Sequence, residues 1–368
     1  DKNLLTGAEQ TKLYIKHLES KNVAVVANHT SVISNQKDGF THLVDSLLAL
    51  NIKVKKVFAP EHGFRGQAEA GEKVDNTIDA ETGLPIVSLY GKHKKPTASD
   101  LSQIDIVVFD IQDVGVRFYT YISTLHYVME ACAEQSIPLL VLDRPNPNRH
   151  YIDGPILEDS YKSFVGMHPV PIVYGLTIGE YAQMINGEKW LRNKIKCDLT
   201  VIPLKNYNIK KNYNLPIRPS PNLPNALSIN LYPSLCLFEG TTVNAGRGTN
   251  NQFQVFGSPF LDPEIYNYQY IPESNLGAEY PKHKSNTCYG KDLTNHDFVD
   301  KIQLDWLINA YRNTSNQDAF FNAFFTKLAG TPRLEQQIKQ GMTAKQIKAT
   351  WQTDLEKFEV LKTKYHLY

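Results

Sequence analysis

The residues best placed for chemistry follow four apolar runs of the chain, each of which ends in polar, glycine and proline residues. The first such cluster, Glu61-His62-Gly63-Phe64-Arg65-Gly66, comes directly after residues 53–60. A carboxyl group partly shielded from water at a strand end can act as a general acid or base, which makes Glu61 the first candidate catalytic residue. A structural alternative is an ion pair between Glu61 and Arg65, with His62 in a turn.

A second cluster follows residues 104–111 and supplies a second carboxylate, Asp113. If the two strands are neighbours, Asp113 could face Glu61 across their ends. Arg117 could bind a substrate carboxylate through two parallel hydrogen bonds, or it could pair with an aspartate and tie down the loop. The candidate substrate-binding residues of these two clusters are His62, Arg65, Gln112, Arg117 and Tyr119.

Two further clusters contain rigid or glycine-rich loops. Residues 143–147 follow the apolar run 138–142, and their two prolines hold the polar groups in fixed directions. Residues 239–250 contain Gly246-Arg247-Gly248, which places an arginine beside flexible backbone N–H groups and is a plausible anion cradle. The candidate substrate-binding residues here are Asp143, Arg144, Asn146, Glu239, Asn244 and Arg247.

The elements that must position these residues form an alternating pattern. Short β-branched runs are typical of strands buried on both faces of a parallel sheet, and ligands of such sheets bind beyond the carboxyl ends of the strands. Helical spacing separates several of the runs, and Thr177 with Glu180 has the pattern of a capping box. Strands are predicted at 22–28, 53–60, 85–90, 104–111, 138–142, 170–174 and 198–204, and helices at 40–50, 119–135 and 177–186.

The composition and the predicted secondary structure of the chain change near residue 205. Residues 206–230 are rich in proline and asparagine, and the last third is more helical, at 300–313, 319–328 and 343–365. We therefore expect an α/β fold with a mostly parallel sheet over 1–205 and a domain boundary near residue 205.

Composition and motifs exclude several classes of function. The 368 residues carry a net charge of +1, so charge gives no reason to expect nucleic acid or an anionic membrane surface as partner. No apolar stretch approaches the length of a membrane span. The four cysteines form no CxxC pair, and GxGxxG, GxxxxGK[ST], HExxH and GxSxG are absent. We expect no nucleotide cofactor and no catalytic metal, although a site at Glu61, His62 and Asp110 is conceivable.

Taken in order, these segments resemble the exo-β-N-acetylmuramidases of the NamZ type, formerly a domain of unknown function. The resemblance covers nearly the whole chain, and it implies a Rossmann-like domain over 1–205, a smaller α+β domain over 206–368 and a catalytic cleft that the second domain completes. The segments that carry the resemblance are Asn28-His29-Thr30-Ser31, residues 59–66, 109–117 and 142–147, Gly175-Leu176-Thr177, Pro219-Ser220-Pro221-Asn222 and Glu239-Gly240-Thr241.

The resemblance implies an exo-acting glycoside hydrolase that releases terminal N-acetylmuramic acid from peptidoglycan fragments. By this analogy Glu61 is the catalytic glutamate, the site lies between the two domains, and the protein is secreted or periplasmic, with a lipid anchor as one option. Asp113 could orient the 2-acetamido group or act as a base, and Arg117 or Arg247 could bind the lactyl carboxylate. A metal-dependent carbohydrate esterase and a non-catalytic peptidoglycan-binding protein are the alternatives.

Overall fold

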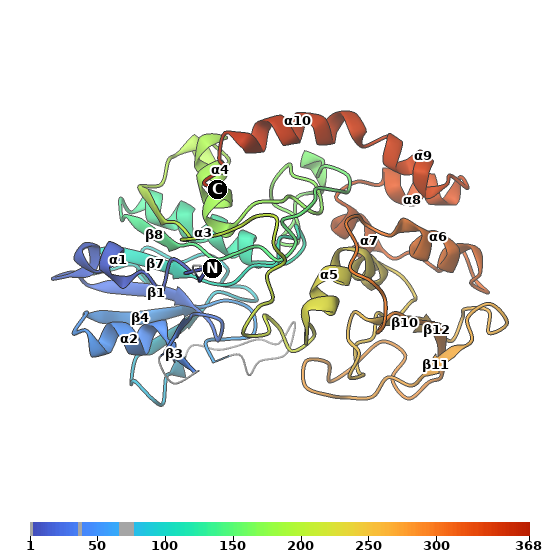
Figure 1. Ribbon diagram of the computed structural model, residues 1–368, viewed down its shortest axis with the longest axis horizontal. Coiled ribbons are helices and arrows are strands. Elements are labelled where there is room, and N and C mark those ends of the chain that lie inside the picture. The colour runs from blue at the N-terminus through green and yellow to red at the C-terminus, as the bar shows by residue number, and fades with distance from the viewer. Residues whose placement is uncertain (1–2, 36–38, 66–76) are drawn as a thin grey trace.

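The N-terminal part of the protein is built on a seven-stranded sheet, seen in a computed structural model that describes residues 3–35, 39–65 and 77–368 (Figure 1). The strand order is β5-β6-β4-β1-β7-β8-β9, and all neighbours are parallel except β5 and β6. The strands are β1 (Val23–Ala27), β4 (Val54–Ala59), β5 (Thr77–Ile78), β6 (Pro85–Ser88), β7 (Ile106–Asp110), β8 (Leu139–Leu142) and β9 (Leu199–Ile202).

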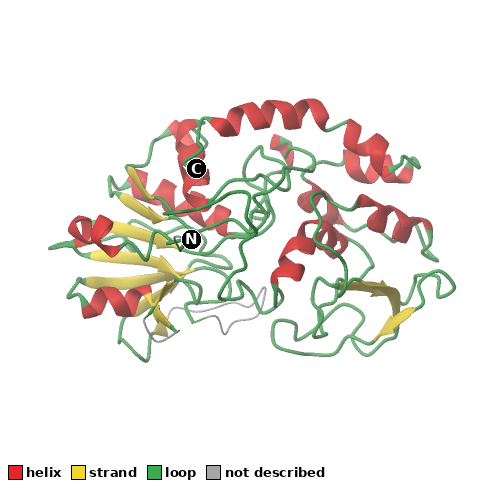
Figure 2. Cartoon of the chain, in the orientation of Figure 1, coloured by secondary structure: helices red, strands yellow, loops and turns green. Residues whose placement is uncertain are grey.

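Helices cover both faces of this sheet, as Figure 2 shows (helices red, strands yellow). Alternate side chains of β1 point to opposite faces. Val23 and Val25 share a core cluster with residues of α1 (Thr11–Leu18) and α2 (Leu43–Ala49), while Ala24 and Val26 share the other cluster with residues of α3 (Tyr121–Glu134) and α4 (Ile178–Gly187). Burial on both faces explains why the strands are continuously apolar.

The C-terminal part is smaller and mixes helices with an antiparallel sheet in the order β10-β12-β11. Its last helix, α10, returns toward the first domain, where the Leu367 N–H donates to the Glu180 carboxylate at 2.9 Å (Figure 1). The elements are α5 (Ala226–Leu235), β10 (Val255–Ser258), β11 (Tyr268–Tyr270), β12 (Cys288–Asp292), α6 (Leu304–Arg312), α7 (Ala323–Ala329), α8 (Arg333–Lys339), α9 (Ala344–Ala349) and α10 (Gln352–Thr363).

A small hairpin and three short helical turns complete the described chain. The hairpin joins β2 (Val32–Ser34) to β3 (Phe40–His42), and the turns are η1 (Asp159–Tyr161), η2 (Arg192–Lys194) and η3 (Cys236–Gly240). Within the described residues, no helix is long and apolar enough to cross a membrane.

The predicted α/β class, with a mostly parallel sheet and a smaller second domain, is confirmed. Six of the seven predicted strands are present, and the Thr177–Glu180 capping box of α4 forms in full. The domain boundary near 205 stays a prediction; residues 206–225 contain neither helix nor strand.

Three predicted elements are wrong in detail. Residues 170–174 are buried but form no strand, because Val173 pairs with Asp153 and the Ile172 carbonyl accepts from the Arg117 N–H, outside the sheet. Buried apolar runs of this length do not by themselves reveal their backbone partners. The helix predicted over 40–50 begins only at Leu43, after β3, and that over 343–365 is divided into α9 and α10.

Candidate active site

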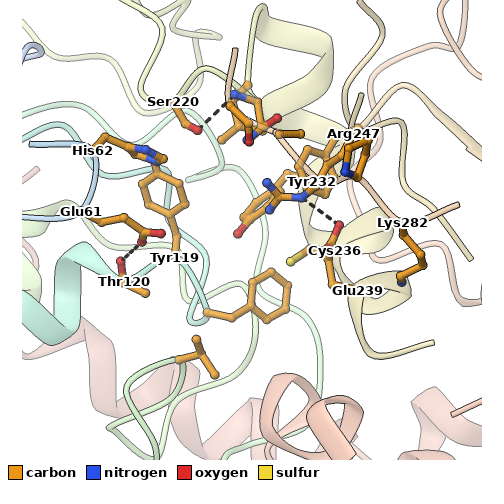
Figure 3. Close-up of a pocket in the computed structure, with 18 of the residues that line it drawn as sticks. Glu61, His62, Tyr119, Thr120, Ser220, Tyr232, Cys236, Glu239, Arg247 and Lys282 are labelled. Carbon is orange, nitrogen blue, oxygen red and sulfur yellow. Dashed lines mark hydrogen bonds and ion pairs between the residues drawn. The ribbon is translucent and has the colours of Figure 1, made fainter. Parts of the chain in front are cut away.

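A cavity of about 1020 Å³ lies between the two domains and takes its lining from both. Figure 3 shows Glu61, His62, Tyr119 and Thr120 on one side, and Glu239 with Arg247 and Lys282 on the other. We call the first set the acid wall and the second the cation wall. The volume is at the upper end of what small-molecule sites usually offer, which suits a ligand larger than a single sugar.

Glu61 lies on the acid wall, in the turn that directly follows β4. The turn is closed by a hydrogen bond from the Gly63 N–H to the Pro60 carbonyl at 3.0 Å, and His62 has φ 70°, a backbone angle rarely adopted by residues other than glycine. Strained backbone of this kind is often kept at functional sites. The turn projects the Glu61 side chain into the cavity instead of along the sheet.

Two hydroxyl groups hold the Glu61 carboxyl group. Thr120 Oγ1 donates to Glu61 Oε2 at 2.9 Å, and Thr120 is the N-cap residue of α3. Burial, together with the charge of Glu61 and a hydrogen bond to it, raises the pKa of Tyr90 to about 12, so the Tyr90 hydroxyl keeps its proton at neutral pH. Glu61 is therefore fixed in position by groups from two other loops of the same domain.

The cation wall contains an ion pair between Arg247 and Glu239 and a second cation, Lys282, whose ammonium protons all donate to carbonyls. Arg247 Nε donates to Glu239 Oε1 at 3.0 Å, and the guanidinium lies 5.3 Å from the centre of the Phe253 ring. Burial raises the pKa of Glu239, but the charges of Arg247 and Lys282 outweigh it and hold that pKa below its usual value. Lys282 Nζ donates to the carbonyls of Phe238, Thr241 and Val243, which uses all three of its protons.

Six of the thirteen candidate residues predicted from sequence line this cavity. They are Glu61, His62, Tyr119, Glu239, Asn244 and Arg247. Tyr119 donates its hydroxyl proton to the Pro219 carbonyl at 3.0 Å, and the Asn244 amide donates to the carbonyls of Arg247 and Lys282. These two residues shape the cavity while their polar groups bind the protein itself.

Asp113 does not line the cavity, which corrects its expected place opposite Glu61. It is 5% exposed, and its Oδ2 accepts from the Gly115 N–H at 2.9 Å and from the Tyr174 hydroxyl. Burial raises the pKa of Asp113 to about 6, against these hydrogen bonds. The carboxylate instead fixes the loop that leads to Tyr119 and Thr120.

Arg117 is also buried away from the cavity, so it does not offer its guanidinium to a ligand there. Nη1 donates to the carbonyls of Pro155 and Val170, and Nη2 donates to those of Leu328 and Ala329 at the end of α7. Burial lowers the pKa of Arg117 to about 9, which still leaves the side chain charged at neutral pH.

The remaining five candidates do not line the cavity and bind other parts of the protein. Arg144 binds Asp110 through two hydrogen bonds, and Asp143 caps α4 by accepting from the Gly179 N–H at 2.8 Å. Arg65 pairs with Asp79 at 2.9 Å, away from the cavity lining. Gln112 donates to the carbonyls of Asp113 and Pro145, and Asn146 donates to that of Leu176. Gly66 lies outside the described residues.

Sequence reasoning missed several lining residues, of which Thr120, Tyr90 and Lys282 matter most. Thr120 stands within the second polar cluster, and a threonine just before a helix was an available signal. Tyr90 and Lys282 had no such signal, because only the folded chain brings them to the cavity. Within the residues that the structure describes, no group of three or more His, Cys, Asp or Glu could hold a metal ion.

Two family models together cover most of this chain. Residues 23–227 match the N-terminal model of exo-β-N-acetylmuramidase NamZ, and residues 230–368 match its C-terminal model. The chain belongs to the exo-β-N-acetylmuramidase NamZ family. The NamZ-type identity expected from the sequence motifs is thereby confirmed.

Three known proteins are similar to this chain over most of their length. A peptidoglycan β-N-acetylmuramidase NamZ of Bacillus subtilis (strain 168) is 38% identical, with 96% of this chain and 89% of that protein covered. A crystal structure of a DUF1343 family protein from Bacteroides fragilis NCTC 9343 has a TM-score of 0.91 at 47% identity, covering 100% of this chain and 99% of the other. A second protein of that family and organism has a TM-score of 0.83 at 29% identity, with 99% of each chain covered.

Proposed function

We propose that this protein is an exo-acting glycosidase that releases terminal N-acetylmuramic acid from peptidoglycan fragments, with Glu61 as general acid. The carrying observation is the Glu61 carboxyl group, held by the Thr120 and Tyr90 hydroxyls inside a cavity that has Arg247 on its opposite side. Family membership supports the same reaction class, since the Bacillus subtilis relative is named a peptidoglycan β-N-acetylmuramidase.

The proposed chemistry places a proton on the glycosidic oxygen. Protonated Glu61 donates to that oxygen as the bond to the anomeric carbon breaks, and the leaving sugar departs as an alcohol. The anomeric carbon is then attacked by water or by the substrate's own 2-acetamido oxygen. Among the described residues, Glu239 and Glu279 are the other carboxyl groups that line the cavity. Glu239 is bound to Arg247 and therefore suits recognition better than proton transfer.

Arg247 is the proposed partner of the lactyl carboxylate, the group that distinguishes N-acetylmuramic acid from N-acetylglucosamine. Two other cationic side chains have no donor to offer: Lys282 uses all its protons on carbonyls, and Arg117 lies outside the cavity. Arg247 engages Glu239 through Nε alone, within the part of the chain that is described. Its two terminal nitrogens can therefore form a fork with a carboxylate.

The proposed cellular address is outside the cytoplasm, secreted or periplasmic, where peptidoglycan is found; a lipid anchor is compatible with it. Cell fractionation with an antibody against the protein tests this directly. Recovery only with cytoplasmic markers would overturn the proposed address and leave the proposed reaction standing.

The decisive experiment offers the purified protein two disaccharides of opposite order. We expect the protein to release N-acetylmuramic acid from the disaccharide that has muramic acid at its non-reducing end. The disaccharide with N-acetylglucosamine at that end should not be cleaved. Wild type and Glu61→Gln are compared by mass spectrometry of the products. Release of acetate from an O-acetylated disaccharide, lost after EDTA treatment, restored by a single divalent ion and without release of N-acetylmuramic acid, would favour the metal-dependent esterase instead. Tight binding without turnover would favour a binding protein.

A further inference from the structure

Phe164 is held at the edge of the cavity by a turn that is tied to the helix beside Glu61. Ser163 and Gly166 exchange backbone hydrogen bonds at 2.9 and 3.1 Å, which places Phe164 at the tip of a tight turn. Ser123 Oγ, in the first turn of α3, donates to the Phe164 carbonyl at 2.7 Å. Since Thr120 directly precedes the same helix and binds Glu61, the Phe164 backbone is fixed relative to the acid.

The Phe164 ring continues the cavity lining outward from Glu61. Tyr90, whose hydroxyl interacts with Glu61, has its ring centre 6.5 Å from that of Phe164. Both residues line the cavity, and both are partly exposed, whereas Tyr232 and Cys236 beside the cation wall are buried. A substrate whose terminal sugar reaches toward the cation wall would therefore extend its remaining sugars past Tyr90 and Phe164.

A single lysine ammonium lies over this ring. Lys94 Nζ is 4.5 Å from the centre of the Phe164 ring. The two neighbouring residues in the chain both have carboxylate partners: His93 Nε2 lies 2.9 Å from Asp100 Oδ2, and Lys95 Nζ pairs with Glu130 and Glu134 at 2.7 Å. Within the described chain, Lys94 has no carboxylate partner. The ion pairs of His93 and Lys95 hold the backbone on either side of it.

We infer that Phe164 and Lys94 form an outer subsite for a second carboxylated sugar, the muramyl residue two positions beyond the cleaved bond. This inference rests on the proposed function, because peptidoglycan strands alternate N-acetylmuramic acid with N-acetylglucosamine. With muramic acid at the cleaved end, the next lactyl carboxylate lies on the third sugar. The Phe164 ring provides an apolar surface for a sugar, and the Lys94 ammonium provides the charge that a lactyl carboxylate needs.

The test compares substrates that differ in the third sugar. Wild type is expected to cleave a tetrasaccharide that carries muramic acid at the third position with a kcat/KM about threefold to fivefold higher than a matched one with N-acetylglucosamine there, the size expected of a partly exposed ion pair. Lys94→Gln should abolish that preference. Lys92→Gln is the matched control, because it removes the same charge from an exposed lysine two residues away. The wild-type preference should also shrink as salt rises from 0.05 to about 0.5 M.

Two results would overturn the outer subsite. One is a wild-type enzyme that treats the two tetrasaccharides alike; the other is a preference that survives in Lys94→Gln or disappears equally in Lys92→Gln. Failure of the proposed function looks different, since the wild type would then release no muramic acid from any of these substrates. Circular dichroism of each variant at the assay temperature establishes that the fold is intact.

Discussion

The two walls of the cavity hold their carboxylates in opposite ways. On the acid wall, the described partners of Glu61 include the hydroxyls of Thr120 and Tyr90. On the cation wall, Glu239 is bound to Arg247, and the charge of Lys282 adds to the positive field around it. A hydroxyl can donate to a carboxylate or accept from a carboxylic acid, so a hydroxyl partner is kept when a proton is transferred. A carboxylate that neutralises an arginine loses that ion pair if it is protonated.

The difference suggests a division of labour between the two domains. In the proposed mechanism, the parallel-sheet domain supplies the group that moves a proton, and the C-terminal domain supplies the charge that recognises the substrate. Changes to Glu61 on the acid wall are expected to slow the chemical step for every substrate. Loss of Arg247 on the cation wall is expected to alter the choice between substrates.

The largest effect is expected from Glu61→Gln, which keeps the shape of the side chain and removes its proton. Turnover of an unactivated muramyl disaccharide should fall at least ~10²-fold, as expected when a general acid is lost. An aryl muramide with a good leaving group needs less protonation and should lose less. Equal losses on both substrates would contradict the role as acid, and near-normal turnover of the disaccharide would remove Glu61 from the mechanism.

Arg247→Ala should weaken the recognition of the lactyl carboxylate by the cation wall. The ratio of kcat/KM for a muramide over the matching glucosaminide should fall about tenfold to 100-fold, because a carboxylate left without its partner costs ~1–3 kcal/mol or more. Lys282→Met serves as the control, since its protons bind carbonyls; it should lower the unfolding temperature and leave the ratio in place. A ratio unchanged in Arg247→Ala would mean that the carboxylate is bound elsewhere.

Thr120→Val sharpens the role of the hydroxyls on the acid wall. The loss of one hydrogen bond to Glu61 should reduce kcat about threefold to tenfold, with a smaller change in KM, given the modest net free energy of such a bond. Thr120→Ser keeps the hydroxyl and should restore most of the rate. If Thr120→Ser is as impaired as Thr120→Val, the methyl group matters and the hydrogen bond does not.

Asp113→Asn should have the smallest effect on the rate of catalysis. Its main effect should be on how the free energy of unfolding changes with pH. The pKa of Asp113 is raised from 3.8 to about 6 by burial, so the folded protein binds this proton more tightly than the unfolded chain between those pH values. The stability that this group contributes is present at low pH and is lost as the pH rises from about 4 to 6. The expected loss is about 3 kcal/mol at most.

Denaturant unfolding at several pH values, compared between wild type and variant, isolates this contribution. The difference in unfolding free energy should change between pH 4 and 6 for Asp113→Asn. Asp100→Asn is the control: hydrogen bonds and His93 lower the pKa of Asp100 despite its burial, so its own contribution changes only at lower pH. The opposite result would be a reduced rate per folded molecule in Asp113→Asn while the difference in unfolding free energy stays constant between pH 4 and 6. That result would make Asp113 a functional carboxylate.

The sequence predicted the parallel sheet and the position of Glu61 well, because both depend on local signals. A β-branched run followed by a polar turn identifies a strand and its carboxyl end, as at β4, β7 and β8. What the sequence could not predict is the side to which each loop turns. Asp113, Arg117 and Arg144 also follow strand ends, yet each is buried and bound to at least one residue that lies more than 30 positions away in the chain.

The cation wall was only partly predictable for a related reason. The glycines around Arg247 indicated an anion site, whereas Lys282 gave no signal at all. Its role depends on three carbonyls near residue 240, which the chain meets again about 40 residues later. Contacts between distant segments of loop carry no periodicity, so no pattern in the sequence reveals them.

Arg117 has a consequence for how this protein can be divided. Its guanidinium is buried with no carboxylate partner among residues 3–35, 39–65 and 77–368, and it binds carbonyls of the first domain and of α7 in the second. Gly330, which ends α7 with φ 74°, leaves the necessary space, because a Cβ there would lie 2.6 Å from Arg117 Nη2. An isolated N-terminal half would keep this cation but lose half of its acceptors. The two halves are therefore poor building blocks for domain exchange, and a chimera must carry Arg117 and α7 together.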